Sequence, residues 1–219
     1  MSTRSKFDSK LIRLKEKLIE MEKLAETAVR NSLSALMNQD IEKANQVIKD
    51  DQAINKLEHE IHDMALLLIA RESPVAKDLR TLNVALKVSS EVERMADMAV
   101  NIAKAALHIG NEKHFKEILD IPKMMDHALE MVSMSVKAYI GEDVMLAQKC
   151  AEKDDEVDRL FGKLVHELIS MVPENPTAMN QIIQLAFVCR FIERIADHST
   201  NIAENVIYLV TGKVFDLNE

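Results

Sequence analysis

Apolar side chains recur along the chain with the alternating three- and four-residue spacing of an α-helix, in long segments divided by short polar stretches. Six helices are predicted from this pattern, over about residues 7–37, 40–71, 74–110, 122–139, 142–171 and 177–211. Most of them stop beside one of the rare helix breakers, such as Pro74, Gly110 and Gly212. Because several reach roughly 30 residues, where about 11–12 is usual, they indicate a long helical bundle or coiled coil.

Composition supports helices throughout. Only 4 glycines and 4 prolines occur in 219 residues, far fewer than the turns of a sheet or a barrel would need. Aromatic residues make up 4% of the chain, Trp is absent and Met reaches 13, which is typical of helices packed on helices. The predicted fold class is therefore all-α, with enough apolar residues, 47%, to bury a sizeable core.

The third and sixth predicted helices carry nearly the same sequence. Residues 93–103 read ERMADMAVNIA and residues 193–203 read ERIADHSTNIA, which agree at seven of eleven positions. The second and fifth helices align as well, at an offset of 103 residues instead of 100. We therefore predict an internal duplication, in which two tandem three-helix bundles of long antiparallel helices occupy residues 1–110 and 111–219.

Charge and cysteine content narrow the function and the compartment. The chain has 28 basic and 36 acidic side chains, a net charge of −8, which disfavours nucleic acid as a partner. Cys150 and Cys189 form no CxxC motif and are expected to be inert thiols in a reducing compartment. Since neither a signal peptide nor a membrane-spanning stretch is found in the sequence, a cytoplasmic protein is predicted.

A pair of carboxylates four residues apart, Glu93 and Asp97, is repeated as Glu193 and Asp197. Residues at this spacing are neighbours on one face of a helix, so each pair can direct its oxygens at one point. Both pairs continue a seam of apolar positions, in the third helix the seam that begins at Val75. Adjacent acids at the end of an apolar seam are costly unless water, a cation or an arginine neutralises them.

The second helix of each unit supplies acids and an amide to face these pairs. Asp51, Asn55 and Glu58 lie on one face at positions i, i+4 and i+7, and the face is repeated as Asp154 and Asp158. Two clusters of carboxylate and amide oxygens, without thiolates, are therefore predicted. Such donors suit Mg²⁺, Mn²⁺, Ca²⁺ or iron better than a closed zinc site, but carboxylates alone do not identify the metal.

The acid pairs also have a simpler explanation than metal binding. Acids at i and i+4 are common on solvated helix faces, and Arg94 and Arg194 beside them could form ordinary ion pairs. The duplication of the whole pattern favours the metal hypothesis over this one. His198, next to Asp197, could join a metal site, although a surface imidazole is the simpler expectation.

No pattern in the sequence predicts an enzyme. A Walker loop, a GxSxG elbow and a Ser-His-Asp or Cys-His arrangement are all absent, and so is the Glu-x-x-His pattern of di-iron bundles. The alternatives to a binding protein are a metal-dependent enzyme or a metal-storage bundle, and a purely structural coiled-coil scaffold. Turnover in an assay with Mn²⁺ or Fe²⁺ would support the enzyme or storage bundle. A protein without bound metal would support the scaffold.

The whole chain resembles the PhoU family of phosphate-signalling regulators. The resemblance rests on D-x-x-x-[ND] in the second helix and E-R-x-[AG]-D…N-I in the third helix of each unit. The family commonly has Gly where this chain has Ala96 and Ala196. Further matching residues run from the first helix to the last: Phe7-Asp8, Ser73-Pro74, Asp78-Leu79-Arg80 and Asn201-Ile202-Ala203.

The resemblance implies a cytoplasmic negative regulator of phosphate uptake and of the phosphate-starvation response. Its implied partners are the phosphate-sensor histidine kinase and the ATPase subunit of the phosphate ABC transporter, with contact to the membrane only through these proteins and with a homodimer as the common assembly. The implied cofactor is a divalent or iron metal cluster, of Fe, Mn, Mg or Zn. Its ligands would be Glu93, Asp97, Glu193 and Asp197, with Asp51, Asp154 and Asp158 facing them.

Overall fold

Helices account for all the regular secondary structure in residues 3–110 and 120–217, the part of the chain that the computed structural model describes. The elements are α1 (Thr3–Asn38), α2 (Ile41–Glu72), α3 (Lys77–Ile109), α4 (Asp120–Gly141), α5 (Val144–Glu152), α6 (Asp154–Ser170), the short 3₁₀ helix η1 (Pro176–Ala178) and α7 (Met179–Thr211). The all-α prediction is confirmed. The predicted boundary between residues 110 and 111 borders the segment 111–119, which lies outside the described residues.

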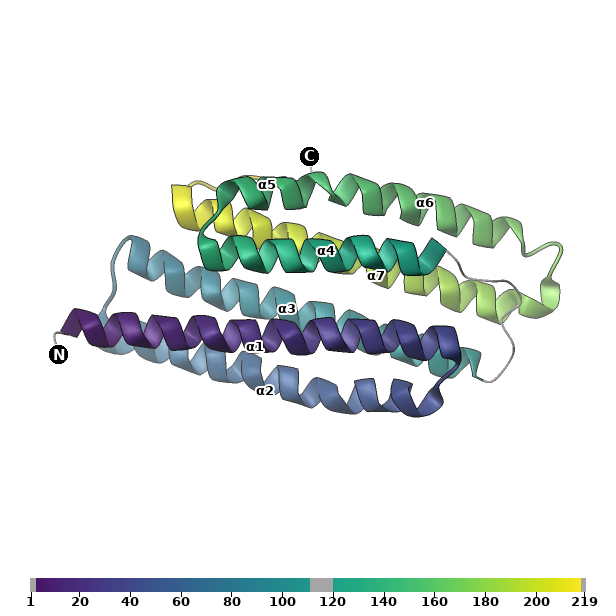
Figure 1. Ribbon diagram of the computed structural model, residues 1–219, viewed down its shortest axis with the longest axis horizontal. Helices are drawn as coiled ribbons and strands as arrows, with labels where there is room; N and C mark the ends of the chain where they lie inside the picture. Colours follow the sequence, from purple (N-terminus) through teal and green to yellow (C-terminus); the bar gives the residue numbers. More distant parts are fainter. Residues whose placement is uncertain (1–2, 111–119, 218–219) are drawn as a thin grey trace.

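The helices form two antiparallel bundles that lie side by side (Figure 1). Helices α1, α2 and α3 pack on one another in the first bundle, and α4, α5, α6 and α7 do so in the second. Helices α3 and α7, which carry the duplicated acid pairs, make the most extensive contact of any two elements. The predicted tandem bundles are therefore confirmed. None of the helices in the described ranges combines the length and the apolar character that crossing a bilayer requires.

The same turn begins the middle helix in each repeat. Asp40 caps α2, since its side chain accepts a hydrogen bond from the backbone N–H of Lys43. Asp143 caps α5 in the same way by accepting from the N–H of Leu146. These aspartates satisfy helix N–H groups that would otherwise lack a partner, and their acidic charge is favourable at a helix N-terminus. The duplication thus extends to the local signal that starts each middle helix.

The structure corrects two predicted helix boundaries. The helix predicted over 142–171 is interrupted at Lys153, where the N–H bonds to the carbonyl of Cys150 three residues earlier, and a new helix, α6, begins at Asp154. Lys153 keeps helical dihedral angles, φ −79° and ψ −17°, so the apolar period continues across the break and does not reveal it. Helix α3 begins at Lys77 and not at Pro74, and Val75 is 74% exposed, so the apolar seam does not extend that far.

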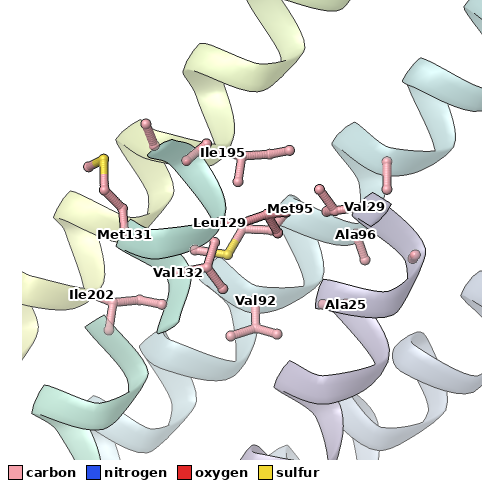
Figure 2. Packing of buried hydrophobic residues seen from close by; sticks show 14 of the residues in the cluster. Ala25, Val29, Val92, Met95, Ala96, Leu129, Met131, Val132, Ile195 and Ile202 are labelled. Carbon is pink, nitrogen blue, oxygen red and sulfur yellow. The ribbon is translucent and has the colours of Figure 1, made fainter. Parts of the chain in front are cut away.

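One hydrophobic core spans both bundles. Figure 2 shows side chains from four helices that meet there, from α1 (Ala25, Val29), α3 (Val92, Met95, Ala96), α4 (Leu129, Met131, Val132) and α7 (Ile195, Ile202). All of these side chains are buried. The small side chains of Ala96 and its counterpart Ala196 are completely buried as well, as a close approach of helices requires. The two repeats therefore share their interior.

Candidate functional site

The four acids predicted in the second repeat interact with one another in the structure. Asp154 and Asp158 come from α6, and Glu193 and Asp197 come from α7. Burial, together with the negative charges of Asp158, Asp197 and Glu193, raises the pKa of Asp154 to about 7. Asp154, Asp158 and Asp197 also line one pocket, so these carboxylates lie close together, although Asp158 itself is exposed. The break at Lys153 places Asp154 in the first turn of α6, where a negative charge is favourable.

Glu193 is the most deeply buried acid of this cluster, with only 7% of its surface exposed. Burial and the charge of Asp197 raise its pKa to about 6. One of its oxygens accepts a hydrogen bond from Nη1 of Arg190. The other oxygen, Oε2, is buried and has no hydrogen-bond partner in the described part of the chain, and the same is true of Oδ1 of Asp154. Buried acceptors without a donor are costly, so these two atoms call for a cation or a water.

An open pocket of about 430 Å³ adjoins the second cluster, and three of the four acids line it together with Asp155, Ala151, Asn201 and Leu217. Leu217 belongs to the segment after α7, which turns back at Gly212 and runs along the molecule to the junction of α5 and α6 (Figure 1). The backbone N–H of Leu217 donates to Glu204 Oε1 over 2.8 Å, which holds the segment there. A small ion in this pocket would therefore meet Asp154, Asp158 and Asp197 directly, whereas Glu193 lies behind them, outside the pocket lining.

The acids predicted in the first repeat also converge, between α2 and α3. Burial and the charge of Asp97 raise the pKa of both Asp51 and Glu93. Asn55 Nδ2 donates to Asp51 Oδ2 over 3.0 Å, whereas Oδ1 of each of these residues is buried without a partner among the described residues. Glu58 adds a further carboxylate, because its charge also raises the pKa of Glu93. Glu58 makes up for the carboxylate that Asn55 lacks, so each cluster has four carboxylates.

The structure places His198 differently from the expectation. Its imidazole is not at the surface but 9% exposed, and Nδ1 lies 2.7 Å from Glu91 Oε2. Asn201 Nδ2 donates to the same oxygen over 3.1 Å. Burial opposes the charged form of Glu91, but these hydrogen bonds lower its pKa below the ordinary value. Glu91 lies on α3, so this group joins the first repeat to the second, and sequence spacing gave no sign of it.

The two cysteines are buried, as inert thiols should be. Burial raises the pKa of Cys150 and of Cys189 to about 12, so neither is a thiolate at neutral pH. A protonated thiol is a weak ligand for a hard cation. The donors that remain are carboxylate and amide oxygens.

The unpartnered atoms of both clusters fit a hard cation. They are carboxylate oxygens of Asp51, Asp154 and Glu193 and the amide oxygen of Asn55, which are the donors that Mg²⁺, Mn²⁺, Ca²⁺ and iron prefer. Over residues 3–110 and 120–217, no three His, Cys, Asp or Glu side chains already enclose a single point as metal ligands. The arrangement thus offers concentrated negative charge and free acceptors, and not a preformed cage.

The protonation of Asp154 predicts how the stability of the metal-free protein depends on pH. Its pKa rises from an ordinary value of 3.8 to about 7 on folding, so the folded state binds the proton more tightly. This contribution to stability is present below about pH 4 and is lost as the pH rises through about 7. Since the site is partly exposed, we expect about 1 kcal/mol, or ~3 °C in the melting temperature, between pH 5 and pH 8.

Thermal denaturation of chelator-treated, dialysed protein at these two pH values measures the effect. Asp154→Asn removes the titrating group and should reduce the difference between pH 5 and pH 8. Asp126→Asn, at an exposed position on α4, serves as the control and should leave the difference unchanged. An undiminished difference in Asp154→Asn would contradict the prediction.

Comparison with known proteins agrees with the two-repeat architecture. The family model described as the PhoU domain matches twice, over residues 18–106 and 121–206. A phosphate-specific transport system accessory protein PhoU homolog from Clostridium acetobutylicum is 37% identical over 218 residues, which is 99% of this chain and all of the relative. A protein of the same name from Aquifex aeolicus is 40% identical over 200 residues, 91% of this chain and 90% of the relative.

Solved structures resemble the chain over nearly its full length. The crystal structure of PhoU from Pseudomonas aeruginosa has a TM-score of 0.90 at 31% identity and covers 94% of this chain and all of its own. The structure of the phosphate transport system regulatory protein PhoU from Streptococcus pneumoniae has a TM-score of 0.89 at 28% identity, over 96% of this chain and 99% of its own. From the repeated domain match and the full-length relatives together, the chain belongs to the PhoU family.

Proposed function

We propose that the protein is a negative regulator of phosphate uptake and of the phosphate-starvation response. It acts in the cytoplasm as a non-enzymatic adaptor between the ATPase subunit of the phosphate ABC transporter and the phosphate-sensor histidine kinase. Relatives that match nearly the whole chain are named accessory proteins of phosphate-specific transport systems, which supports the regulatory role. In this proposal the acidic clusters bind metal ions, which hold the helices of the adaptor together.

The proposal includes metal binding at both clusters. Glu93 and Asp97, with Asp51 facing them, would hold an ion in the first repeat. Glu193 and Asp197 would do so in the second repeat, with Asp154 and Asp158 facing them. A bound cation supplies positive charge that cancels the repulsion between carboxylates and holds the middle and third helices together. The observation that carries this proposal is the buried, unpartnered Oε2 of Glu193, a residue only 7% exposed.

The proposal also includes a homodimer. The apolar side chains of Met179, Ile183 and Phe187 follow one another at successive turns of α7 and are 52%, 41% and 51% exposed. Residues four apart lie on one helix face, so these three form an apolar stripe. The stripe offers a contact surface for a second copy of the chain, because contiguous exposed apolar surface favours association.

The experiment that tests the function combines metal analysis with partner capture. Glu93→Ala/Asp97→Ala should lower the content of divalent metal or iron in protein purified without chelator, and should weaken capture of the transporter ATPase and the sensor kinase. The matched control is Glu16→Ala/Glu20→Ala, an exposed pair of acids four residues apart on α1, outside both clusters. Unchanged metal and unchanged capture in the first variant would overturn the proposal.

A further inference from the structure

Asp155 adds a fifth, exposed carboxylate beside the second cluster, and the two clusters also differ in their positive charge. Position 90 on α3 corresponds to position 190 on α7, and these residues are serine and arginine. Ser90 Oγ donates to Glu58 Oε1 over 2.9 Å, so this position adds no charge to the first cluster. In the second repeat the counterpart of Glu58 is Phe161, and the Arg190 guanidinium lies over its ring, 5.8 Å from the centroid.

Arg190 acts on two acids of the second cluster. Its Nη1 forms an ion pair with Glu193 Oε1. Burial raises the pKa of Asp197, and the charge of Arg190 is the largest influence that opposes this rise. An arginine keeps its charge at any physiological pH, so the second cluster always has this counter-ion. The side chain of Arg190 is 43% exposed, which leaves room for it to move away into solvent.

The other arginines and the lysine that act on the clusters do not produce this difference. Arg94 and Arg194 occupy equivalent positions in the two repeats and act on Glu93 and Glu193 alike. The positive charge of Lys104 lowers the pKa of Asp51 in the first cluster, but it is the smallest of the influences on that pKa. The side chain of Lys104 is also exposed. A charge that acts through water is strongly screened, whereas Arg190 is in direct contact with its acid. Among the described residues, Arg190 is therefore the permanently charged side chain that forms an ion pair with a cluster acid, and the first repeat has no counterpart of it.

We infer that Arg190 is a built-in counter-ion of the second cluster that a divalent cation must displace, so that the first cluster binds divalent cations more tightly than the second. This inference rests on the proposed metal binding and adds a specific order to it. A cation that enters the first cluster meets carboxylates without a paired arginine. A cation that enters the second has to break the ion pair between Arg190 and Glu193 and then share the site with a displaced positive charge.

Exchange of the two counterpart residues tests the inference on the full chain. Chelator-treated protein is titrated with Mn²⁺ in a calorimeter, and wild type should show a tighter and a weaker class of sites. Arg190→Ser should tighten the weaker class about tenfold, which corresponds to about 1.4 kcal/mol. Ser90→Arg should weaken the tighter class. Arg30→Ser, which removes an arginine that pairs with Glu26 on α1, is the charge-matched control and should change neither class.

Further variants assign the classes and guard against misfolding. Glu193→Gln/Asp197→Asn should abolish the weaker class and leave the tighter one. Arg190→Gln keeps a stem to cover the Phe161 ring and should repeat the effect of Arg190→Ser, with circular dichroism as the check on folding. No Mn²⁺ binding by wild type would overturn the proposed metal function itself. Mn²⁺ binding whose weaker class does not change in either folded Arg190 variant would overturn only the inference.

Discussion

Saturating Mn²⁺ should raise the melting temperature of the chelator-treated protein by about 10 °C or more. A ligand that binds only the folded state at about 100 times its Kd stabilises that state by about 2.7 kcal/mol per site. For a chain of this size, 1 kcal/mol corresponds to about 2–4 °C in the melting temperature, and two sites are proposed. The carboxylates gain most from an ion because their buried oxygens lack partners. Differential scanning calorimetry with and without Mn²⁺ measures the shift.

The fourfold variant Glu93→Gln/Asp97→Asn/Glu193→Gln/Asp197→Asn tests whether these acids cause the shift in melting temperature. It should lose the response to Mn²⁺. In the presence of chelator it should melt at a higher temperature than wild type, because the neutral amides remove repulsion that raises the pKa of Glu93 and Glu193. A variant that still responds to Mn²⁺ would show that the ion binds elsewhere, and a variant that melts below wild type in chelator would show that repulsion is not the dominant effect.

Truncation of Ile195 to alanine should destabilise the whole protein, by about 2–5 kcal/mol. Ile195 is completely buried in the core that both repeats share (Figure 2). The lost side chain removes apolar contacts and leaves a cavity that the surrounding helices fill only in part. Because the core is continuous across the bundles, both repeats should still unfold together in one transition.

Urea denaturation followed by circular dichroism gives the free energy of unfolding for this variant. Ile12→Ala is the matched control, since the same side chain is 60% exposed on α1 and its removal should cost well under half as much. Two separate unfolding transitions, with only the second repeat weakened, would contradict the idea of a single shared core. An equal loss in both variants would show that burial does not determine the cost.

The long helices could be predicted from the sequence because their apolar period is regular over many turns and breakers are rare. The interruption at Lys153 could not, since its dihedral angles are still helical and the period passes through it unchanged. The apolar period of the third helix reaches back to Val75 in the sequence, because periodicity does not depend on which neighbours are present. Before the start of α3, no element among the described residues buries this side chain, and it stays exposed.

The acidic clusters could be predicted because the same spacing occurs twice and because 3.6 residues per turn place its members on one face. The contacts of His198 and Glu91 could not, because these residues are 107 positions apart and meet only when the bundles pack together. One signal was present: His198 replaces Met98 of the first repeat, which is a partly buried side chain in the core. A titratable group at an apolar position calls for a buried partner.

The contact between α3 and α7 joins two counterpart helices of a duplicated unit, as a symmetric homodimer would, but within one polypeptide. An interface between separate identical subunits dissociates on dilution, and every substitution appears on both sides of it. In this chain the association is intramolecular, so it does not depend on protein concentration. Each copy is also free to change alone, which is how Ser90 and Arg190, or Asn55 and Asp158, can stand at equivalent positions. Covalent fusion has thus turned a symmetric pair into two sites that can specialise.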